Sequence, residues 1–323
     1  MHEYFKIDYD KHPAYSNVRI NLFEYIYIYT LFLKAFLVLG IRQTFIKKYK
    51  RSMHVSNLGK KNNTVISQFN ENGFMKLRDK KIVKTLKVQL QSYITEVEEK
   101  IKQTPVSVRG FSDCVIGYKE NENVLMFRKI EDTLFSNTNI HEIISKYFNT
   151  NKTKLVYFQI HINQEEDEFV FKHDHDDLIE EKMNFFHVDT NSNTVKAMVY
   201  LTDVLKEENG AFQYVSGSHK YYSAALFLKR KIVKRVGAFR RDKKGKKILL
   251  GLPRSFRVKN EFDDFSSKSK LGIYIQENKV SCANGADVII FDPLGIHRGG
   301  IVKEGKRIAV QLVFCPDQSW KTG

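Results

Sequence analysis

The C-terminal half of the chain alternates short apolar runs with turns rich in glycine, asparagine, aspartate and proline. From residue 155 onward the runs are LVYFQIHI, VKAMVYLTDV, AFQYVS, GIYIQ, ADVIIF and RIAVQLVF. Many short strands separated by turn signals are typical of a β-sandwich or barrel. The sequence has no fixed-period repeat, which argues against a solenoid or a propeller. The pattern predicts a mainly β fold.

The segment before these strands has helical spacing. QFNENGFMKLRD, which ends at Asp79, predicts a short helix, a turn at Gly73 and a strand. A further helix is expected from about Lys80 to Lys102, where apolar residues recur at intervals of four. Helices should therefore flank the β core on its N-terminal side.

A polar stretch from residue 52 to 66, SMHVSNLGKKNNTVI, reads as a linker. It divides the chain into an N-terminal extension, residues 1–66, with an apolar helix and a basic linker, and a main domain, residues 67–323. The apolar segment, residues 21–41, approaches the roughly 20 residues of a membrane span. Glu24 and Lys34 lie inside it, and a charge near the bilayer centre costs about 2.5–3.5 kcal/mol, which disfavours a span.

Two interpretations of the apolar segment stay open. It can be a core helix packed on the main domain. Alternatively, it lies in the membrane interface and the basic residues that follow, as far as Arg51, contact anionic lipid, so that residues 21–51 make a peripheral membrane contact. Cys114, Cys282 and Cys315 are odd in number and widely spaced, which argues against a disulfide framework. We expect a cytoplasmic protein, with peripheral membrane association under the second interpretation.

The positive charge is concentrated in one region. The whole chain carries a formal net charge of +16. Between Lys229 and Lys270 there are 16 Lys and Arg residues and four acids, a net +12. This basic insertion, about residues 226–270, predicts an anionic partner, or else a solvated loop. Few aromatic rings beyond those of Phe239 and Phe256 are interleaved with the charges, so a base-stacking nucleic-acid platform is poorly supported.

Three polar residues adjoin the predicted strands in a pattern typical of a metal site. His187 and Asp189 precede the strand VKAMVYLTDV, and His297 follows the strand ADVIIF. In extended chain, residues i and i+2 point the same way, so His187 and Asp189 can face one ion. Two histidines and one carboxylate leave three coordination positions open, as in non-haem Fe(II) oxygenases. The sequence therefore predicts an iron site of His187, Asp189 and His297.

The same His-x-Asp spacing occurs once more, in FKHDHDD, at His175 and Asp177. That copy runs into the charged, helix-like stretch LIEEKM, whereas His187 precedes an apolar strand, where a rigid site belongs. We interpret HDHDD as an acidic lid. Arg307 lies ten residues after His297 and opens a strand. Its planar guanidinium is suited to the distal carboxylate of a dicarboxylate cosubstrate.

From about Ser67 to Phe314 the chain resembles the phytanoyl-CoA dioxygenase family of Fe(II)/2-oxoglutarate oxygenases. The resemblance is carried by QFNENGFMKLRD, FHVD, YLTDV, ENGAFQYVSGSHK, GADVIIFDPLGIHRGG and Arg307, in that order. It implies a double-stranded β-helix, a jelly-roll or cupin-like core with flanking helices. It also implies Fe(II), 2-oxoglutarate and O₂ as cofactor and cosubstrates, and hydroxylation as the chemistry. His187, Asp189 and His297 would be the catalytic metal ligands, and Arg307 would bind 2-oxoglutarate.

The chain departs from the family pattern at several positions. Ser216 stands where a proline is common, and Gly299 and Ala309 lack hydroxyl groups that help to hold the cosubstrate in relatives. A second anchor must come from elsewhere, and Gln159 resembles a residue that faces this pocket in relatives. His219, in the Gly-Ser-His turn, is expected to be structural.

These residues predict a dioxygenase that hydroxylates an anionic or lipid-linked small molecule. The carboxylate of Asp189 leaves no vacant position for a halide, which argues against a halogenase. One alternative is an inactive β-helix module whose basic face binds membrane or nucleic acid. Another is a cupin-like iron enzyme that does not use 2-oxoglutarate. The intact triad argues against the first alternative, and Arg307 argues against the second.

Overall fold

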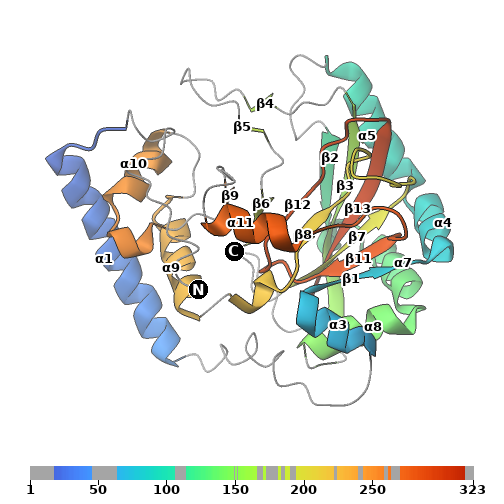
Figure 1. Cartoon of the computed structure of the whole chain (residues 1–323), viewed down its shortest axis with the longest axis horizontal. Coiled ribbons are helices and arrows are strands. Elements are labelled where there is room, and N and C mark those ends of the chain that lie inside the picture. The colour runs from blue at the N-terminus through green and yellow to red at the C-terminus, as the bar shows by residue number, and fades with distance from the viewer. Residues whose placement is uncertain are drawn as a thin grey trace.

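The computed structural model consists of two facing β-sheets with helices on both outer sides (Figure 1). A short antiparallel pair, β4 (Val170–Phe171) and β5 (Glu181–Lys182), lies apart from both sheets. The structure describes residues 18–45, 64–105, 114–148, 150, 152–165, 170–171, 181–182, 186–189, 194–221, 224–238, 243–257, 261–262 and 270–316.

The larger sheet has six antiparallel strands in the order β1-β11-β7-β13-β3-β2. Their bounds are β1 Phe74–Leu77, β11 Val288–Phe291, β7 Val195–Tyr200, β13 Lys306–Pro316, β3 Thr153–Gln164 and β2 Val115–Lys119. The longest pair, β3 and β13, runs from Lys306 opposite Gln164 to Pro316 opposite Thr153, with one irregularity at Val313/Phe314. This pair forms the centre of the fold.

The smaller sheet has five strands in the order β10-β8-β12-β6-β9. Their bounds are β10 Lys279–Ser281, β8 Gln213–Val215, β12 His297–Arg298, β6 Phe186–His187 and β9 Glu261–Phe262. Between β3 and β13 the chain passes repeatedly from one sheet to the other. Two facing sheets built in this way make a double-stranded β-helix, so the predicted fold class is confirmed.

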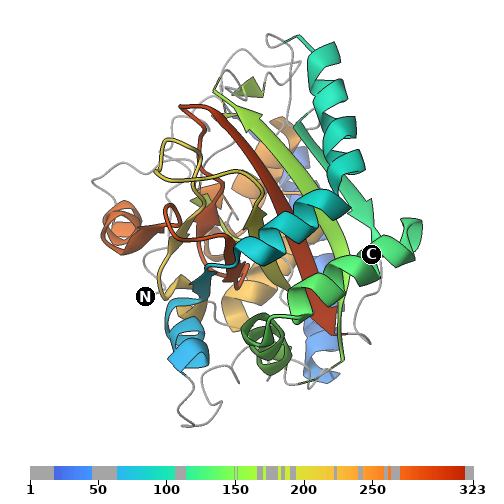
Figure 2. The ribbon, with the colours of Figure 1, turned by 90° about the vertical axis from the view of Figure 1, so that its right-hand side faces the viewer.

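Helices cover the outer face of the six-stranded sheet, where Figure 2 shows the cyan and green helices lying in front of the long strands. Leu86, Ile130, Phe158 and Leu312 share one core at this contact. Asp79 and Asn123 cap two of the helices, because each side chain accepts a hydrogen bond from a backbone N–H of the first turn. The bounds are α3 Thr64–Asn72, α4 Lys80–Gln89, α5 Gln91–Gln103, η5 Glu120–Glu122, α7 Val124–Phe135 and α8 Thr138–Phe148.

A second group of helices lies on the opposite side of the molecule, at the left of Figure 1. α1 (Leu22–Phe45) packs against α9 (Ala224–Arg235) and α10 (Lys243–Gly251), and the three share a separate apolar core. We refer to α1, α9 and α10 together as the lateral module. The apolar N-terminal segment therefore packs on the basic insertion. The remaining helices among the described residues are η6 Ser218–Tyr221, η7 Arg254–Phe256 and α11 Lys270–Asn278.

The local predictions have mixed outcomes. The helix, turn and strand expected before Asp79 are confirmed as α3, Gly73 with a φ of 80°, and β1. The single helix expected over Lys80–Lys102 is two helices that meet at Leu90. The strand predicted for GIYIQ is wrong, because these residues belong to α11. Glu181 and Lys182, within the stretch read as helix-like, form a strand. The division at residue 66 and the limits of the insertion stay predictions.

Candidate metal centre

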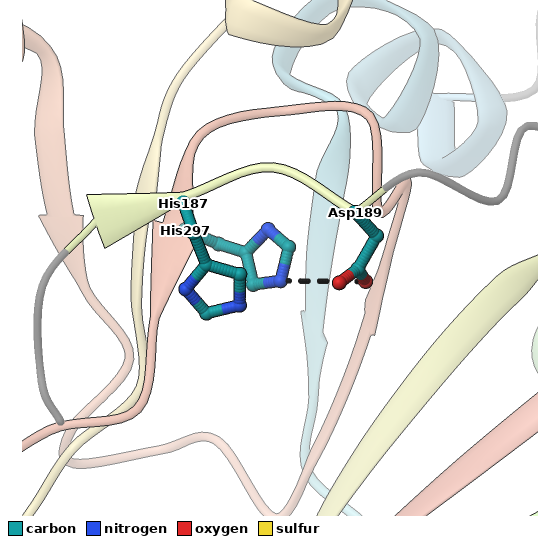
Figure 3. Close-up of side chains that lie close together, drawn as sticks. All are labelled: His187, Asp189 and His297. Carbon is teal, nitrogen blue, oxygen red and sulfur yellow. Dashed lines mark ion pairs between the residues drawn. The ribbon is translucent and has the colours of Figure 1, made fainter. Parts of the chain in front are cut away.

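The three predicted ligands come together at one end of the five-stranded sheet. β6 and β12 are neighbours, and His187 pairs directly with His297 across them. Asp189 follows β6 by two residues, and its backbone N–H donates to the carbonyl of Pro293, which holds the two ligand segments side by side. One ligand atom of each residue lies within 4.8 Å of the others. Figure 3 shows the two imidazoles beside each other with the carboxylate next to them.

The ring of His297 is oriented by a hydrogen bond within its own loop. Its Nδ1 lies 2.8 Å from the carbonyl oxygen of Gly295, so this nitrogen carries the proton and donates it. The other ring nitrogen, Nε2, is then free of a proton and lies 3.7 Å from Oδ2 of Asp189. A histidine held in this way by a carbonyl is the usual arrangement for a metal ligand.

The loop from Asp292 to His297 is fixed from two sides. Tyr214 donates its hydroxyl proton to the carbonyl of Asp292 at 2.9 Å, and the N–H of Ile296 donates to Oγ of Ser218 at 2.7 Å. A Cβ atom on Gly295 would lie 1.8 Å from the Tyr214 hydroxyl, so only glycine fits at this position. The Gly-Ser-His turn thus helps to place the distal histidine.

Lys196 supplies a positive charge beside the ligands. Its Nζ lies 2.8 Å from Oδ2 of Asp189, in an ion pair that is largely buried. Burial alone would raise the pKa of Asp189, but Lys196, His297 and His187 together hold that pKa below its usual value. Burial, together with the neighbouring His187, lowers the pKa of His297 to about 3. Near neutral pH the carboxylate is therefore ionised and His297 is neutral, the forms that bind a metal.

Arg307 is buried on the inner face of the six-stranded sheet. Its guanidinium donates to the carbonyl of Gly210, to that of Gly300 at 3.1 Å and to Oδ1 of Asn163 at 2.6 Å. Its Nε is a buried donor without a hydrogen-bond acceptor among the described residues. A buried donor of this kind normally has a partner, so a carboxylate oxygen on this side of Arg307 would fit.

Gln159 lies on β3, on the same face as Asn163, the residue that accepts a hydrogen bond from Arg307, but four residues earlier in the strand. Gln159 is opposite Gln311, whose Nε2 donates to it at 2.9 Å, whereas Asn163 is opposite Arg307. The assignment of Gln159 as a second anchor stays a prediction. Asn163 and Lys196 were not singled out from the sequence, although the alternation of YFQIHIN places residues 159, 161 and 163 on one face.

His219 occupies a structural position. Its Nε2 lies 3.2 Å from the carbonyl oxygen of Asn70, and burial lowers its pKa to about 4. It packs beside Gly73, between α3 and Tyr214 of the smaller sheet. The second His-x-Asp copy, at His175 and Asp177, lies outside the described residues.

No family model matches the sequence, and no curated protein matches it. Among solved structures the chain is similar to the non-heme alpha ketoglutarate dependent carbocyclase SnoK from nogalamycin biosynthesis, with 14% identity over 81% of this chain and 85% of that one and a TM-score of 0.44. It is also similar to HygX from Streptomyces hygroscopicus with nickel and 2-oxoglutarate bound, with 16% identity over 81% of this chain and 90% of that one and a TM-score of 0.42. A third similar structure is EctD from S. alaskensis with bound Fe, with 14% identity over 80% of this chain and 79% of that one and a TM-score of 0.46. These likenesses are distant, with identities of 16% or less.

Proposed function

We propose that the protein is an Fe(II)/2-oxoglutarate-dependent dioxygenase. The observation that carries this proposal is the His187, Asp189 and His297 cluster, placed at the ends of neighbouring strands with its ligand atoms within 4.8 Å of one another. Two imidazole nitrogens and one carboxylate on a single side of an ion leave the opposite side for other ligands. When bound, iron with 2-oxoglutarate and O₂ supplies the oxidising power for attack on a C–H bond.

The protein residues around the cluster prepare it for a divalent cation. The Nδ1 proton of His297 is committed to Gly295, which directs Nε2 to the ion. The carbonyl of Pro293 holds the backbone of Asp189 beside the loop that carries His297. Ligands that are oriented before the metal arrives lose little further conformational freedom on binding, so the site is preorganised.

Arg307 is proposed to hold the far carboxylate of 2-oxoglutarate. It donates to the carbonyl of Gly300, which is only three residues beyond His297, so the two backbone positions are at most about 11 Å apart. Its buried Nε still needs an acceptor, and carboxylates are the acceptors that suit a guanidinium. Asn163 holds the guanidinium in place through its Oδ1.

For the substrate we propose an anionic or lipid-linked small molecule that becomes hydroxylated. The net charge of +12 in the basic insertion supports an anionic substrate, because such a field attracts negative charge. The inner face of the fold also carries cationic groups, Arg307 and Lys196. Hydroxylation is the chemistry that the family resemblance implies.

The test is an anaerobic titration with Fe(II) and 2-oxoglutarate, followed by visible absorption. We expect a charge-transfer band that needs both additions, and succinate formation once air is admitted. Asp189→Ala should abolish the band. His141→Ala, a histidine of α8 outside the cluster, should retain it. Absence of the band from the unaltered protein, with no succinate formed, would contradict the proposal and favour an inactive module.

Two further results would separate the alternatives. Iron binding without any spectral effect of 2-oxoglutarate would indicate an iron enzyme that does not use this cosubstrate. A screen of oxygen consumption over anionic metabolites and lipids tests the substrate class. The expected product is heavier than its substrate by one oxygen atom. A desaturated or cyclised product would support an iron-dependent oxidation but contradict hydroxylation.

A further inference from the structure

The lateral module has an apolar core of its own. Ile28, Phe32 and Ala35 follow one face of α1 at intervals of four and three residues, and all three are buried. They pack against Ile232 of α9 and Ile248 of α10, which face them from the basic insertion. One face of α1 is therefore buried by contacts within the chain.

The opposite face of α1 is also apolar, and it is exposed. Phe23 and Leu22 are 83% and 70% exposed. Ten of the fifteen large apolar residues that are exposed in the described part of the chain belong to this one helix. A surface helix of a water-soluble domain normally presents polar residues on its outer face, and a large exposed apolar patch marks an interaction site. The ten are Leu22, Phe23, Tyr25, Ile26, Tyr27, Tyr29, Leu33, Phe36, Leu37 and Val38.

Positive charge borders this apolar face. A cavity of about 420 Å³ lies between α1 and α10, where Tyr27 and Ile28 meet Lys243, Lys244 and Lys247. Lys247 is paired with Glu24 at 2.5 Å, but Lys243 and Lys244 are exposed. α9, which packs on the buried face of α1, also carries exposed cations at Lys231, Lys234 and Arg235. Apolar side chains edged by lysines fit a surface that is hydrocarbon inside and anionic at its boundary.

We propose that the lateral module docks on an anionic membrane surface, with α1 lying in the plane of the interface. The exposed face of α1 would enter the boundary between headgroups and acyl chains. The lysines of α10 and the cations of α9 would contact anionic headgroups. The tyrosines of α1 suit this depth, because their rings are apolar and their hydroxyls are polar.

A flat orientation agrees better with the packing than a span does. The segment Leu22–Leu39, with a mean hydropathy of 1.7, is long and apolar enough to cross a membrane. To span, however, α1 would have to leave its contacts with Ile232 and Ile248, or carry the lysine-rich helices α9 and α10 into hydrocarbon. Docking in the interface preserves the apolar core and keeps the lysines among the hydrated headgroups, outside the hydrocarbon.

Charge also argues against a second copy of the chain as the partner. Pairing two lateral modules through α1 would bring two sets of exposed cations together, which is unfavourable. An anionic bilayer neutralises the same cations. The module is joined to the metal centre, because β9 lies on the same insertion and pairs with β6, placing Glu261 opposite His187. Docking would thus hold the iron site close to a membrane.

The experiment is co-sedimentation of the full chain with vesicles of phosphatidylcholine alone or with about one third phosphatidylglycerol. We expect at least tenfold stronger partition onto the anionic vesicles, weakened by salt. The double variant Phe23→Glu/Ile26→Glu should lose at least tenfold in partition. The matched variant Val88→Glu/Leu125→Glu changes two exposed apolar residues outside the module and should bind normally. Lys243→Ala/Lys244→Ala should weaken partition about fivefold for each lysine.

Several results would overturn the docking. One is equal partition of Phe23→Glu/Ile26→Glu and its matched control, and another is no preference for anionic vesicles. Protein that resists extraction by alkaline carbonate would indicate a span. Self-association through α1 without vesicle binding would indicate a second copy as the partner. Circular dichroism of each variant checks that the helices are retained. Membrane docking does not depend on oxygenase activity, and succinate formation in the variants is read separately.

Discussion

The two faces of the six-stranded sheet differ in composition although the same strands build both. On β13, the side chains of Ile308, Val310 and Leu312 point outward and are buried against the helices. The alternate residues of β13, Arg307, Ala309 and Gln311, point toward the other sheet. On β7, Lys196 faces inward beside Asp189, whereas its neighbours Val195 and Ala197 belong to the outer core.

This difference shows that the outward face of the sheet supplies stability, whereas the inward face carries residues of the candidate site. Burial of a charged group such as Arg307 opposes folding unless hydrogen bonds compensate. The outward residues supply apolar burial that stabilises the sheet and fixes the strand positions. The inward residues can then be polar and still be held in place. Four substitutions test this division, and they follow in order of decreasing expected effect.

The largest effect is expected from His187→Ala, a change on β6 of the five-stranded sheet, which the inward face of the six-stranded sheet meets. Losing a metal ligand should weaken Fe(II) binding more than about 100-fold, because even the loss of groups that only support ligands costs 10–100-fold. His187 is half-buried, so the free energy of unfolding without metal should change little. Calorimetric titration and urea unfolding measure the two quantities. Fe(II) binding that persists at normal strength would contradict the metal centre.

Leu312→Ala is the matched outward change. Leu312 is completely buried, and its truncation should lower the free energy of unfolding by about 2–5 kcal/mol. The folded protein should still bind Fe(II) within about twofold of normal, because the ligands come from the other sheet. A tenfold loss of affinity in the folded fraction would show that the two faces are not independent.

Arg307→Lys should have a smaller and more selective effect. Lysine keeps the charge but loses the fork and the buried Nε. Hydrogen bonds to charged groups contribute about 1.5–3 kcal/mol, so the Kd for 2-oxoglutarate should rise about 10–100-fold while Fe(II) affinity stays the same. Arg78→Lys, an exposed arginine bonded to Asn284, is the control. An unchanged Kd for 2-oxoglutarate would show that Arg307 does not bind the cosubstrate.

The smallest effect is expected from Lys196→Met. Lys196 stabilises the Asp189 carboxylate when no metal is bound, but its charge repels a divalent cation. Removing it should tighten Fe(II) binding by up to about tenfold and destabilise the metal-free protein. Calorimetry measures the Kd, and Lys76→Met, which changes an exposed lysine of β1, is the control. Weaker Fe(II) binding would instead mean that Lys196 orients Asp189.

The β core was predictable because alternation of apolar and polar residues is a local pattern. The spacing of His187, Asp189 and His297 relative to the strands was local as well, and the structure brings these three together. Which inward residue of β3 meets Arg307 depends on strand register, which includes an irregularity at Val313/Phe314. The sequence does not reveal register, so Asn163 was missed.

Other features depend on contacts between distant segments. A short, largely apolar run such as GIYIQ suits a strand or a buried helix equally. Packing decided for the helix, since Ile275 is buried in a cluster with Phe186 and Val188. The contact of α1 with α9 and α10 joins segments about 200 residues apart. The sequence indicated an apolar segment and a basic insertion, but not that they meet.

The pairing of β9 with β6 has a consequence for the solubility of the protein. A strand at the rim of a sheet exposes unpaired N–H and C=O groups, which invite another chain to add on. β6 is enclosed between β12 and β9, so the strand that carries His187 is not at the rim. Excising the basic insertion would uncover β6 and create an aggregation-prone border. Deletion of the insertion is therefore expected to promote aggregation, in addition to abolishing the binding of any partner that the insertion recruits.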